Sequence, residues 1–264
     1  MKKIIYVFAI YDQVPEFTKY TLKTISNYAD QVGADLKIIS QISQLSKAYP
    51  KAQIILDKGS EFPHFYKLYA LEEFAHSSYD KMMLIDDDIL VRKNAFDLFE
   101  FHINGHFLAS QHICENGKNH LAVIEKEQLS NLLIETIIRL AKAGPAGEFL
   151  VNQLRNIINS GLYVVDKDTA IALTGAFSAP IDDYSVFGWY DQGYLIQKIG
   201  EAKIMCQEIP AGIHSNPILS NSSVQGNTIC ISKNINIDFL HFNGISLEKK
   251  NALIKEIFLS SDIF

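Results

Sequence analysis

Three consecutive carboxylates follow an apolar segment in the first half of the sequence. Residues 82–85 are apolar and lead directly into Asp86, Asp87 and Asp88. Residues two apart in an extended chain share a face, so Asp86 and Asp88 are expected to point together and Asp87 away from them. Adjacent anions repel one another unless a cation or hydrogen bonds compensate them. The pattern fits either a site for Mg²⁺ or Mn²⁺, which prefer oxygen ligands, or a solvated turn rich in aspartate.

Three further polar groups lie in the second half of the chain. Asn159 and Gly161 flank a serine ahead of an apolar run, and His241 follows an apolar pair. Asp191 and Gln192 lie near the start of a predicted helix. Taken alone, each has an ordinary structural explanation: a polar turn, a hydrogen-bonded core histidine, and a charge at a helix N-terminus. They become informative only as an ordered set together with the three aspartates.

The elements that must position these residues alternate between strand and helix. Apolar runs and three- and four-residue spacings predict strand 3–11, helix 15–28, strand 35–40, helix 63–75 and strand 81–86. This order implies parallel strands covered by helices. Open sheets of this class bind ligands at the carboxyl ends of central strands, which is where Asp86 and Asp88 lie.

The second half of the chain has a less regular pattern. It predicts helix 121–143, a break at 144–147, strand 162–165, loop 176–188, helix 190–199, irregular loops with short strands over 213–236, and helix 247–259. The loop 179–189 carries aromatic and acidic residues, which suit either contact with a bound ligand or a solvated cover over the core. We find no internal repeat or linker, so the chain is predicted to form a single domain.

Composition narrows the function classes. The 264 residues fit one domain with a large core, and the net charge of -6 argues against nucleic-acid binding through a broad basic face. Cys114, Cys206 and Cys230 have no Cys-x-x-Cys spacing, so neither a disulfide framework nor a structural zinc site is expected. The apolar run 4–10 lacks a cleavage pattern, and no run reaches transmembrane length. We expect a cytoplasmic protein, with peripheral contact at the inner membrane face left open.

In this order, the set of motifs resembles the GT-A glycosyltransferases, most closely glycosyltransferase family 8, the bacterial sugar transferases. The corresponding positions are residues 9–12, Lys67, Asp86 with Asp88, Asn159 to Gly161, Asp191 with Gln192, and His241 to Gly244. The resemblance implies an α/β fold with a Rossmann-like, mostly parallel central sheet flanked by helices. It departs from the family in two places: Lys67 stands where arginine is usual, and the family's late Gly-x-Lys-Pro-Trp is missing, the nearest lysines being Lys249 and Lys250.

The resemblance also implies roles for individual residues. Asp86, Asp88 and His241 would be ligands of Mn²⁺ or Mg²⁺. The donor, a nucleotide sugar that is UDP-linked, would be bound by Ala9, Tyr11, Asp12, Lys67, Asp87 and Gly244. Asp191, Gln192 and Asn159 would be the catalytic residues. The chain would divide into a nucleotide-binding half (1–90), an acceptor-binding half (91–246) and a terminal helix (247–264).

The implied reaction is transfer of a hexose to a glycan or lipid-linked acceptor. An inverting enzyme would use a carboxylate as general base, for which Asp191 is the candidate. In a retaining enzyme the leaving diphosphate would take the proton, with Gln192 near the reacting carbon. The Asp-Gln pair and the late histidine favour retention, and inversion stays open.

Two alternatives compete with this prediction. A haloacid-dehalogenase-like phosphohydrolase also has an apolar strand followed by Asp-x-Asp, but usually near the chain start and with Thr or Val where Leu90 stands here. The second alternative is a nucleotide-sugar-binding module without turnover. The presence of all of Asp86, Asp88, Asp191 and His241 argues against such decay.

Overall fold

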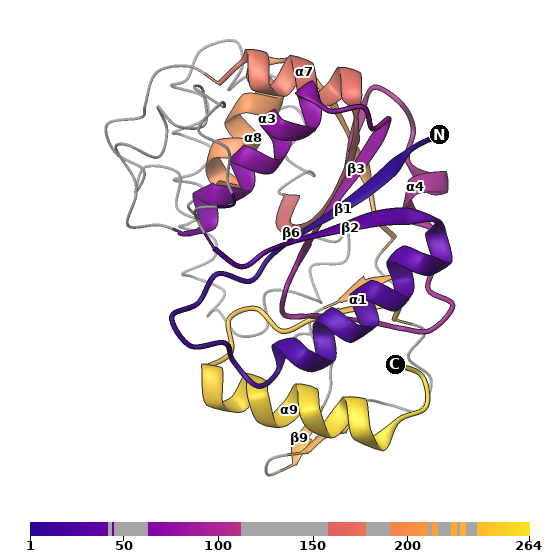
Figure 1. Ribbon diagram of the computed structural model, residues 1–264, viewed down its shortest axis with the longest axis vertical. Helices are drawn as coiled ribbons and strands as arrows, with labels where there is room; N and C mark the ends of the chain where they lie inside the picture. Colours follow the sequence, from indigo (N-terminus) through magenta and orange to yellow (C-terminus); the bar gives the residue numbers. More distant parts are fainter. Residues whose placement is uncertain are drawn as a thin grey trace.

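A six-stranded sheet forms the centre of the computed structural model (Figure 1). The structure describes residues 1–41, 44, 63–111, 158–177, 191–210, 213–215, 223–225, 228–230 and 237–264. The strand order is β2-β1-β3-β6-β5-β7. The bounds are β1 Lys3–Phe8, β2 Ala34–Ile39, β3 Lys81–Asp86, β5 His106–Gln111, β6 Ile158–Asp166 and β7 Met205–Glu208.

The sheet is mostly parallel, as the sequence predicts. β1 pairs in parallel with β2 and β3, and β5 pairs in parallel with β7. β6 is antiparallel to both of its neighbours, β3 and β5, so it alone runs against the other strands. The reversal of β6 was not predicted, because neighbours in a sheet are fixed by tertiary pairing rather than by local pattern.

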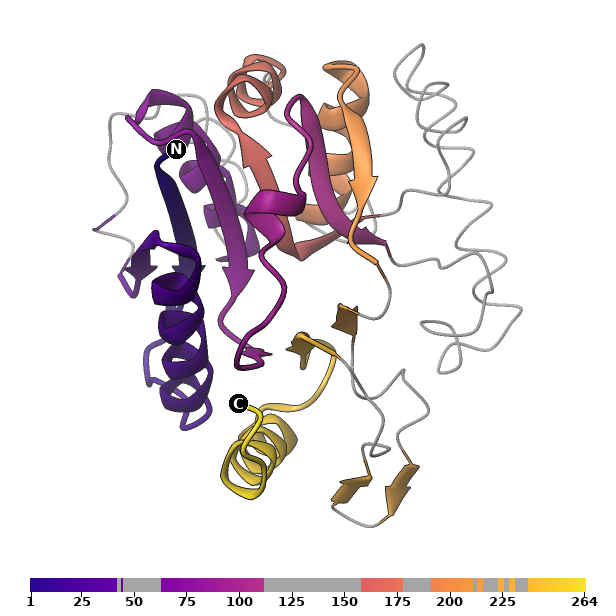
Figure 2. The same cartoon turned by 90° about the vertical axis from the view of Figure 1, so that its right-hand side faces the viewer.

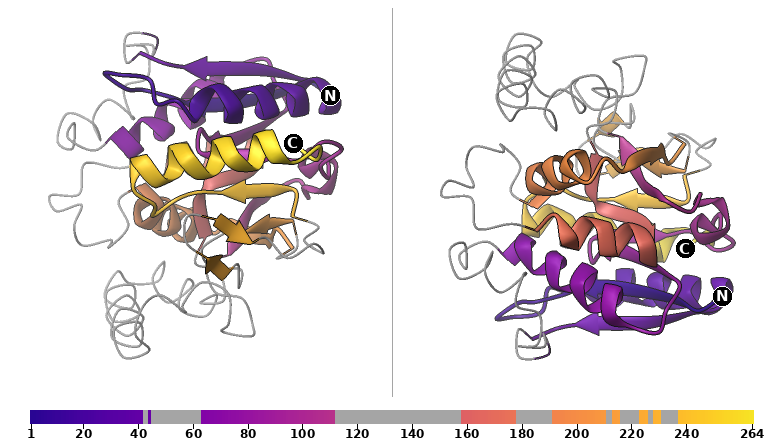
Figure 3. Two further views of the ribbon diagram at one scale, coloured as in Figure 1. Left: turned by 90° about the horizontal axis from the view of Figure 1, so that it is seen from below. Right: turned by 90° about the horizontal axis from the view of Figure 1, so that it is seen from above.

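Helices cover both faces of this sheet. The 3-10 helix η2 (Pro63–Tyr66) leads into α3 (Lys67–His76), which shares one face with α7 (Lys167–Gly175) and α8 (Asp191–Glu201). The opposite face carries α1 (Thr18–Val32) and the short α4 (Leu98–Phe101). Figure 2 shows the strands of the sheet side by side, and the two views in Figure 3 show the helices on its two faces in turn.

The apolar sequence of strand β3 reflects its burial on both faces of the sheet. Met82 and Leu84 pack into the cluster under α3, whereas Met83 and Ile85 pack into the cluster under α1. All four side chains are fully buried. A strand buried on both faces reads as a continuous apolar run, and its central place puts Asp86 where the sheet ends.

A second, three-stranded sheet joins the end of β3 to the C-terminal part of the chain. Its strands are β4 (Ile89–Val91), β11 (Phe239–His241) and β8 (His214–Ser215), in the order β4-β11-β8. β11 is antiparallel to β4, and their register sets His241 opposite Ile89, one residue after the aspartates. A two-stranded sheet of β9 (Ser223–Gln225) and β10 (Thr228–Cys230) completes the strands described.

The C-terminal helix α9 (Leu247–Ser260) lies beside α1 (Figure 3). Leu253 and Ile254 pack with Phe17, which precedes α1, and with Leu240 and Phe242 of the β11 segment. This third apolar cluster attaches the end of the chain to the turn that carries the carboxylates.

The predicted elements agree with the structure where local pattern is strong and differ at several boundaries. The first strand ends at Phe8 instead of residue 11, and α1 runs past the predicted residue 28 to Val32. It stops there because Gly33, with φ of 66°, caps it in the left-handed conformation. The predicted polar turn at Asn159–Gly161 is wrong, because β6 begins at Ile158 and these residues belong to the strand.

Some predicted elements lie outside the described residues: helix 121–143, the break at 144–147 and nearly all of the loop 176–188. Strands β4, β5, β7 and β11 and helices α4 and α7 were not predicted. They are short or only partly apolar, so their sequence periodicity is weak. Within the part of the chain that is described, no helix has both the length and the apolar character needed to cross a membrane.

Candidate metal and donor site

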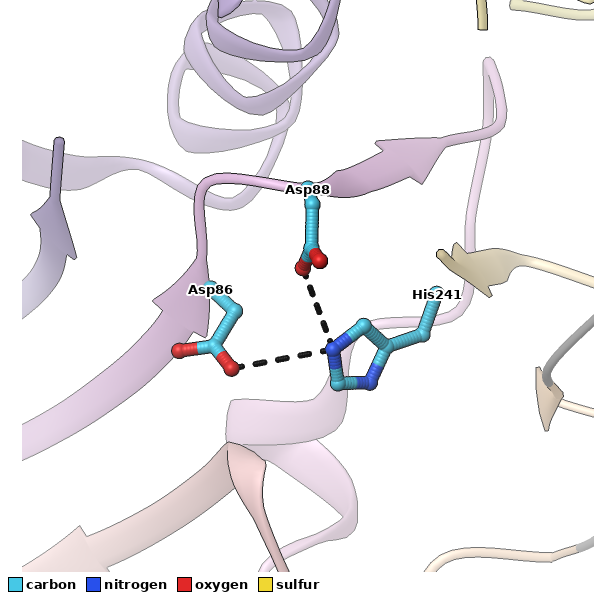
Figure 4. Close-up of side chains that lie close together, drawn as sticks. All are labelled: Asp86, Asp88 and His241. Atoms are coloured by element: carbon cyan, nitrogen blue, oxygen red, sulfur yellow. Dashed lines mark ion pairs between the residues drawn. The ribbon is translucent and has the colours of Figure 1, made fainter. Parts of the chain in front are cut away.

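The two aspartates predicted to point together do so, and His241 faces them (Figure 4). Asp86 is the last residue of β3, and Asp88 ends the turn before β4. Nε2 of His241 lies 3.6 Å from Oδ2 of Asp86 and 3.1 Å from Oδ1 of Asp88. One ligand atom from each residue lies within 4.8 Å of the others. The three side chains therefore form a group that can hold a metal ion.

The hydrogen bonding of this group fits a cation. Oδ1 of Asp88 and Nε2 of His241 are buried, but their contact lacks hydrogen-bond alignment, and neither atom makes another hydrogen bond within the described residues. Buried polar atoms are normally satisfied, since an unsatisfied one costs free energy. A cation between these atoms would satisfy both.

The backbone of β6 forms the floor of the group. A Cβ atom placed on Gly161 would lie under 3.0 Å from His241, from Oδ2 of Asp86 and from Oδ1 of Asn159. Oδ1 of Asn159 accepts a hydrogen bond of 2.7 Å from the Gly161 N–H, which fixes the amide beside the group. Glycine is needed at this position for space, because its backbone is ordinary strand.

Lys67 links the metal group to the start of α8. Its Nζ lies 2.7 Å from Oδ1 of Asp86 and 3.7 Å from Oδ2 of Asp191. Burial by itself lowers the pKa of Lys67, but Asp86 and Asp191 outweigh that effect, so the pKa is raised and the ammonium stays charged. The buried lysine therefore holds the two carboxylates in fixed positions.

Lys250 of α9 reaches the other side of the aspartate turn. Its Nζ lies 2.5 Å from Oδ2 of Asp88. Burial raises the pKa of Asp88, yet His241 and Lys250 together hold that pKa well below its usual range. For Asp87, burial and the charge of Asp88 raise the pKa to about 7, and a hydrogen bond with Tyr11 works in the opposite direction. Asp88 is thus the fixed anion of the turn.

A pocket of about 200 Å³ opens beside the group at the carboxyl ends of β1 and β3. This is the edge at which sheets of this class bind ligands. It is lined by Phe8, Ile10, Tyr11, Lys67, Asp86, Asp87, Asp88 and Lys250.

The structure brings most of the predicted site residues together. Asn159 lies under the metal group, and Asp191 and Gln192 are buried at the start of α8. Three predicted donor residues do not line the pocket within the described part of the chain. Ala9 is buried and donates its N–H to the carbonyl of Ile39. Asp12 and Gly244 are exposed, and for all three a donor role stays a prediction.

Sequence reasoning missed one pocket residue that carries charge, Lys250. The signal was present, since two lysines follow the late histidine where the family has one. Position alone could not choose between Lys249 and Lys250. The placement of helix α9 identifies Lys250 as the lysine of the site, because Lys250 contacts Asp88 and Lys249 is exposed.

Comparison with known proteins gives a family match and a similar solved structure. Residues 3–131 match glycosyl transferase family 8. No curated protein matches the chain. A solved structure described as a glycosyltransferase involved in the glycosylation of the major capsid of PBCV-1 is similar with a TM-score of 0.55 at 10% identity. The similarity covers 97% of this chain and 100% of that one, and at such low identity it shows a shared fold.

The family match includes the strands β1 and β3, helix α3 and the turn from Asp86 to Asp88. It supports glycosyl transfer over the phosphohydrolase alternative. The chain is thus similar to the glycosyltransferases of family 8 and has a GT-A-like fold, as its motifs predict.

Proposed function

We propose that this protein is a metal-dependent glycosyltransferase that moves a hexose from a UDP-linked sugar to a glycan or lipid-linked acceptor. The observation that carries the proposal is the group of Asp86, Asp88 and His241 in and beside a pocket at the carboxyl end of β3. The match to family 8 over residues 3–131 supports the reaction class. The cytoplasm stays the predicted compartment.

Asp86, Asp88 and His241 would hold Mn²⁺ or Mg²⁺. Bound there, the ion would act as a Lewis acid that neutralises the departing diphosphate. Gly161 leaves the space that Asp86 and His241 need, and the Lys67 ammonium would hold Asp86 in place beside the ion.

The donor would lie in the pocket next to this group. Tyr11 is partly exposed at the pocket wall, where its ring could stack on a nucleobase. Asp12 would accept a hydrogen bond from the base or the ribose, and Ala9 and Gly244 would approach the nucleotide with their backbones. Asp87 would contact the donor from the pocket wall, where its side chain is hydrogen-bonded to Tyr11.

Asp191, Gln192 and Asn159 would surround the transferred sugar. Asp191 lies within 3.7 Å of the Lys67 ammonium, which would position it as a general base toward an acceptor hydroxyl in an inverting reaction. In the retaining reaction, which we favour, Gln192 would lie near the reacting carbon. The nucleotide-binding half would end at residue 90 and the acceptor-binding half at residue 246. His241 and Lys250, which lie beyond residue 90, would also contribute to the donor site.

A thermal-shift panel of nucleoside diphosphates with and without Mn²⁺ tests the proposal. A ligand that binds only the native state raises its melting temperature, and we expect UDP with Mn²⁺ to give the largest rise. Asp88→Asn should abolish the Mn²⁺-dependent part of that rise while the circular dichroism spectrum stays unchanged. An equal Mn²⁺-dependent rise in Asp88→Asn would contradict the site. Release of phosphate from p-nitrophenyl phosphate would instead support the phosphohydrolase.

A further inference from the structure

The imidazole ring of His241 has a defined orientation at the metal group (Figure 4). Its Nε2 faces the carboxylates of Asp86 and Asp88 at 3.6 Å and 3.1 Å. Its Cε1 lies toward the backbone of Gly161, 2.4 Å from where an added Cβ atom would stand. Half a turn of the ring about its Cβ–Cγ bond would exchange the places of Nε2 and Cε1. The ring would then present a carbon atom to the aspartates, so its rotation decides whether His241 can be a ligand.

The backbone at His241 is fixed, but it does not set the rotation of the ring. His241 pairs with Ile89 across β4 and β11, and the N–H of Phe242 donates a hydrogen bond of 3.1 Å to the carbonyl of Asp88. The second side-chain torsion of histidine is broad and roughly two-fold, so it does not choose between the two ring positions. A metal-binding histidine usually donates its other ring N–H to an oxygen atom, which fixes the ring. Within the described residues, Nδ1 of His241 makes no hydrogen bond, so packing is what holds the ring there.

A second imidazole, that of His214, packs against this ring. Strand β8 pairs in parallel with β11 and sets His214 opposite Phe239, two residues before His241. Residues two apart on a strand share a face, so His214 and His241 are diagonal neighbours on one face of the small sheet. Their ring centres lie 5.4 Å apart, with the ring planes tilted by 52°. Both side chains are buried, and His241 therefore has little room to rotate while His214 is in place.

The backbone of β11 fixes His214 in turn. The carbonyl of the preceding residue, Ile213, accepts hydrogen bonds from the N–H groups of Asp238 and Phe239, at 2.9 Å and 2.8 Å. Among the described residues, the ligand atoms that converge come from Asp86, Asp88 and His241, so His214 lies next to the metal group rather than in it.

We infer that His214 is a positioning residue: its ring blocks rotation of the His241 imidazole and keeps Nε2 directed at Asp86 and Asp88. The inference rests on the proposed function, since it takes the metal-binding role of His241 from there. The contact needs a flat ring of about this size and not a ring nitrogen. Phenylalanine should therefore replace His214, and alanine should not.

The first part of the test observes the ring in the metal-free protein by nuclear magnetic resonance. Because Cε1 of His241 lies beside Gly161, a nuclear Overhauser effect is expected between the Cε1 proton and the Gly161 α protons. The effect should be equally strong in the wild type and His214→Phe, and at least threefold weaker in His214→Ala. His214→Ser repeats the measurement if the alanine variant does not fold. An undiminished effect in these small-residue variants, or no effect in the wild type, overturns the inference.

The second part measures Mn²⁺ binding by isothermal titration calorimetry. His214→Ala is expected to bind Mn²⁺ about tenfold more weakly than the wild type, as for other groups that orient a metal ligand. His214→Phe should stay within threefold of the wild type. Leu240→Val is the matched control: it lies beside His241 on β11, but its side chain packs into the separate cluster around Phe17. It should lower the melting temperature and leave Mn²⁺ affinity within threefold of the wild type.

The remaining outcomes separate the inference from the function on which it rests. A loss in His214→Phe as large as in His214→Ala would make the ring nitrogens of His214 essential and overturn a role in packing. An equal loss in Leu240→Val would trace the effect to the stability of β11 and overturn positioning. Equal Mn²⁺ affinity in the wild type and His214→Ala overturns the inference and leaves the metal site standing. Absence of Mn²⁺ binding in the wild type overturns the metal site and the inference with it.

Discussion

The two sides of the candidate site are built in different ways. On the sheet side, Asp86, Asn159 and Gly161 lie on adjacent strands of the central sheet, and Lys67 enters from a buried helix. On the C-terminal side, His241 ends a three-residue strand and Lys250 lies in the first turn of α9.

The difference lies in what holds each side. Strands β3 and β6 pair along five registered positions and are buried on both faces, so their residues move only if the sheet does. The C-terminal groups depend on a short ladder to β4 and on one apolar cluster around Phe17. We conclude that the sheet side holds Asp86, Asn159 and Gly161 through extensive strand pairing, whereas the C-terminal side brings His241 and Lys250 to the site from less extensively packed elements.

The largest expected effect comes from removing the buried charge on the sheet side. Lys67→Met leaves Asp86 and Asp191 without their shared cation, and breaking such a buried pair costs about 3 kcal/mol of unfolding free energy. Urea denaturation followed by circular dichroism measures this cost. Lys67→Arg keeps the charge and should recover most of the stability. If both variants have the same free energy of unfolding as the wild type, the buried Lys67 does not stabilise the sheet side.

Next in size is the effect of filling the floor of the site. Gly161→Ala puts a methyl group under 3.0 Å from side-chain atoms of His241, Asp86 and Asn159, so these side chains must move from their present positions. We expect Mn²⁺ affinity to fall about a hundredfold, as loss of ligand geometry at a metal site does. Gly175→Ala serves as the control, because nothing lies within 4 Å of its added carbon. Calorimetric titration of Mn²⁺ compares the two, and equal affinities would contradict the close packing at Gly161.

The smallest expected effect lies on the C-terminal side. Asn251→Ala removes the acceptor of the Phe17 N–H, at a cost of about 1 kcal/mol in unfolding free energy. Because α9 still packs through Leu253 and Ile254, Mn²⁺ affinity should change less than threefold. Urea denaturation and Mn²⁺ titration test the two parts of the prediction. A loss as large as that of Lys67→Met would erase the contrast between the two sides.

Much of the site could be predicted because its residues carry strong local signals. Residues 82–85 form a fully apolar run that ends in charge, which identified both the strand and the position of Asp86 and Asp88. His241 could be chosen only through its order among the other motifs, because a histidine after two apolar residues is common in protein cores. The donor roles of all the predicted residues stay predictions, and three of these residues, Ala9, Asp12 and Gly244, do not line the pocket.

The sequence by itself determined the class of the sheet, its central strand and the carboxylates at its end, because the hydrophobic period and the charge pattern are local properties. Tertiary structure alone decided that β6 is antiparallel to its neighbours and that Gly161 lies beside Asp86 and His241. It also decided that Lys250 rather than Lys249 reaches Asp88. Each of these depends on which segments pair or pack across more than seventy residues of chain. No periodicity within a segment encodes that choice; the packing of the whole core makes it.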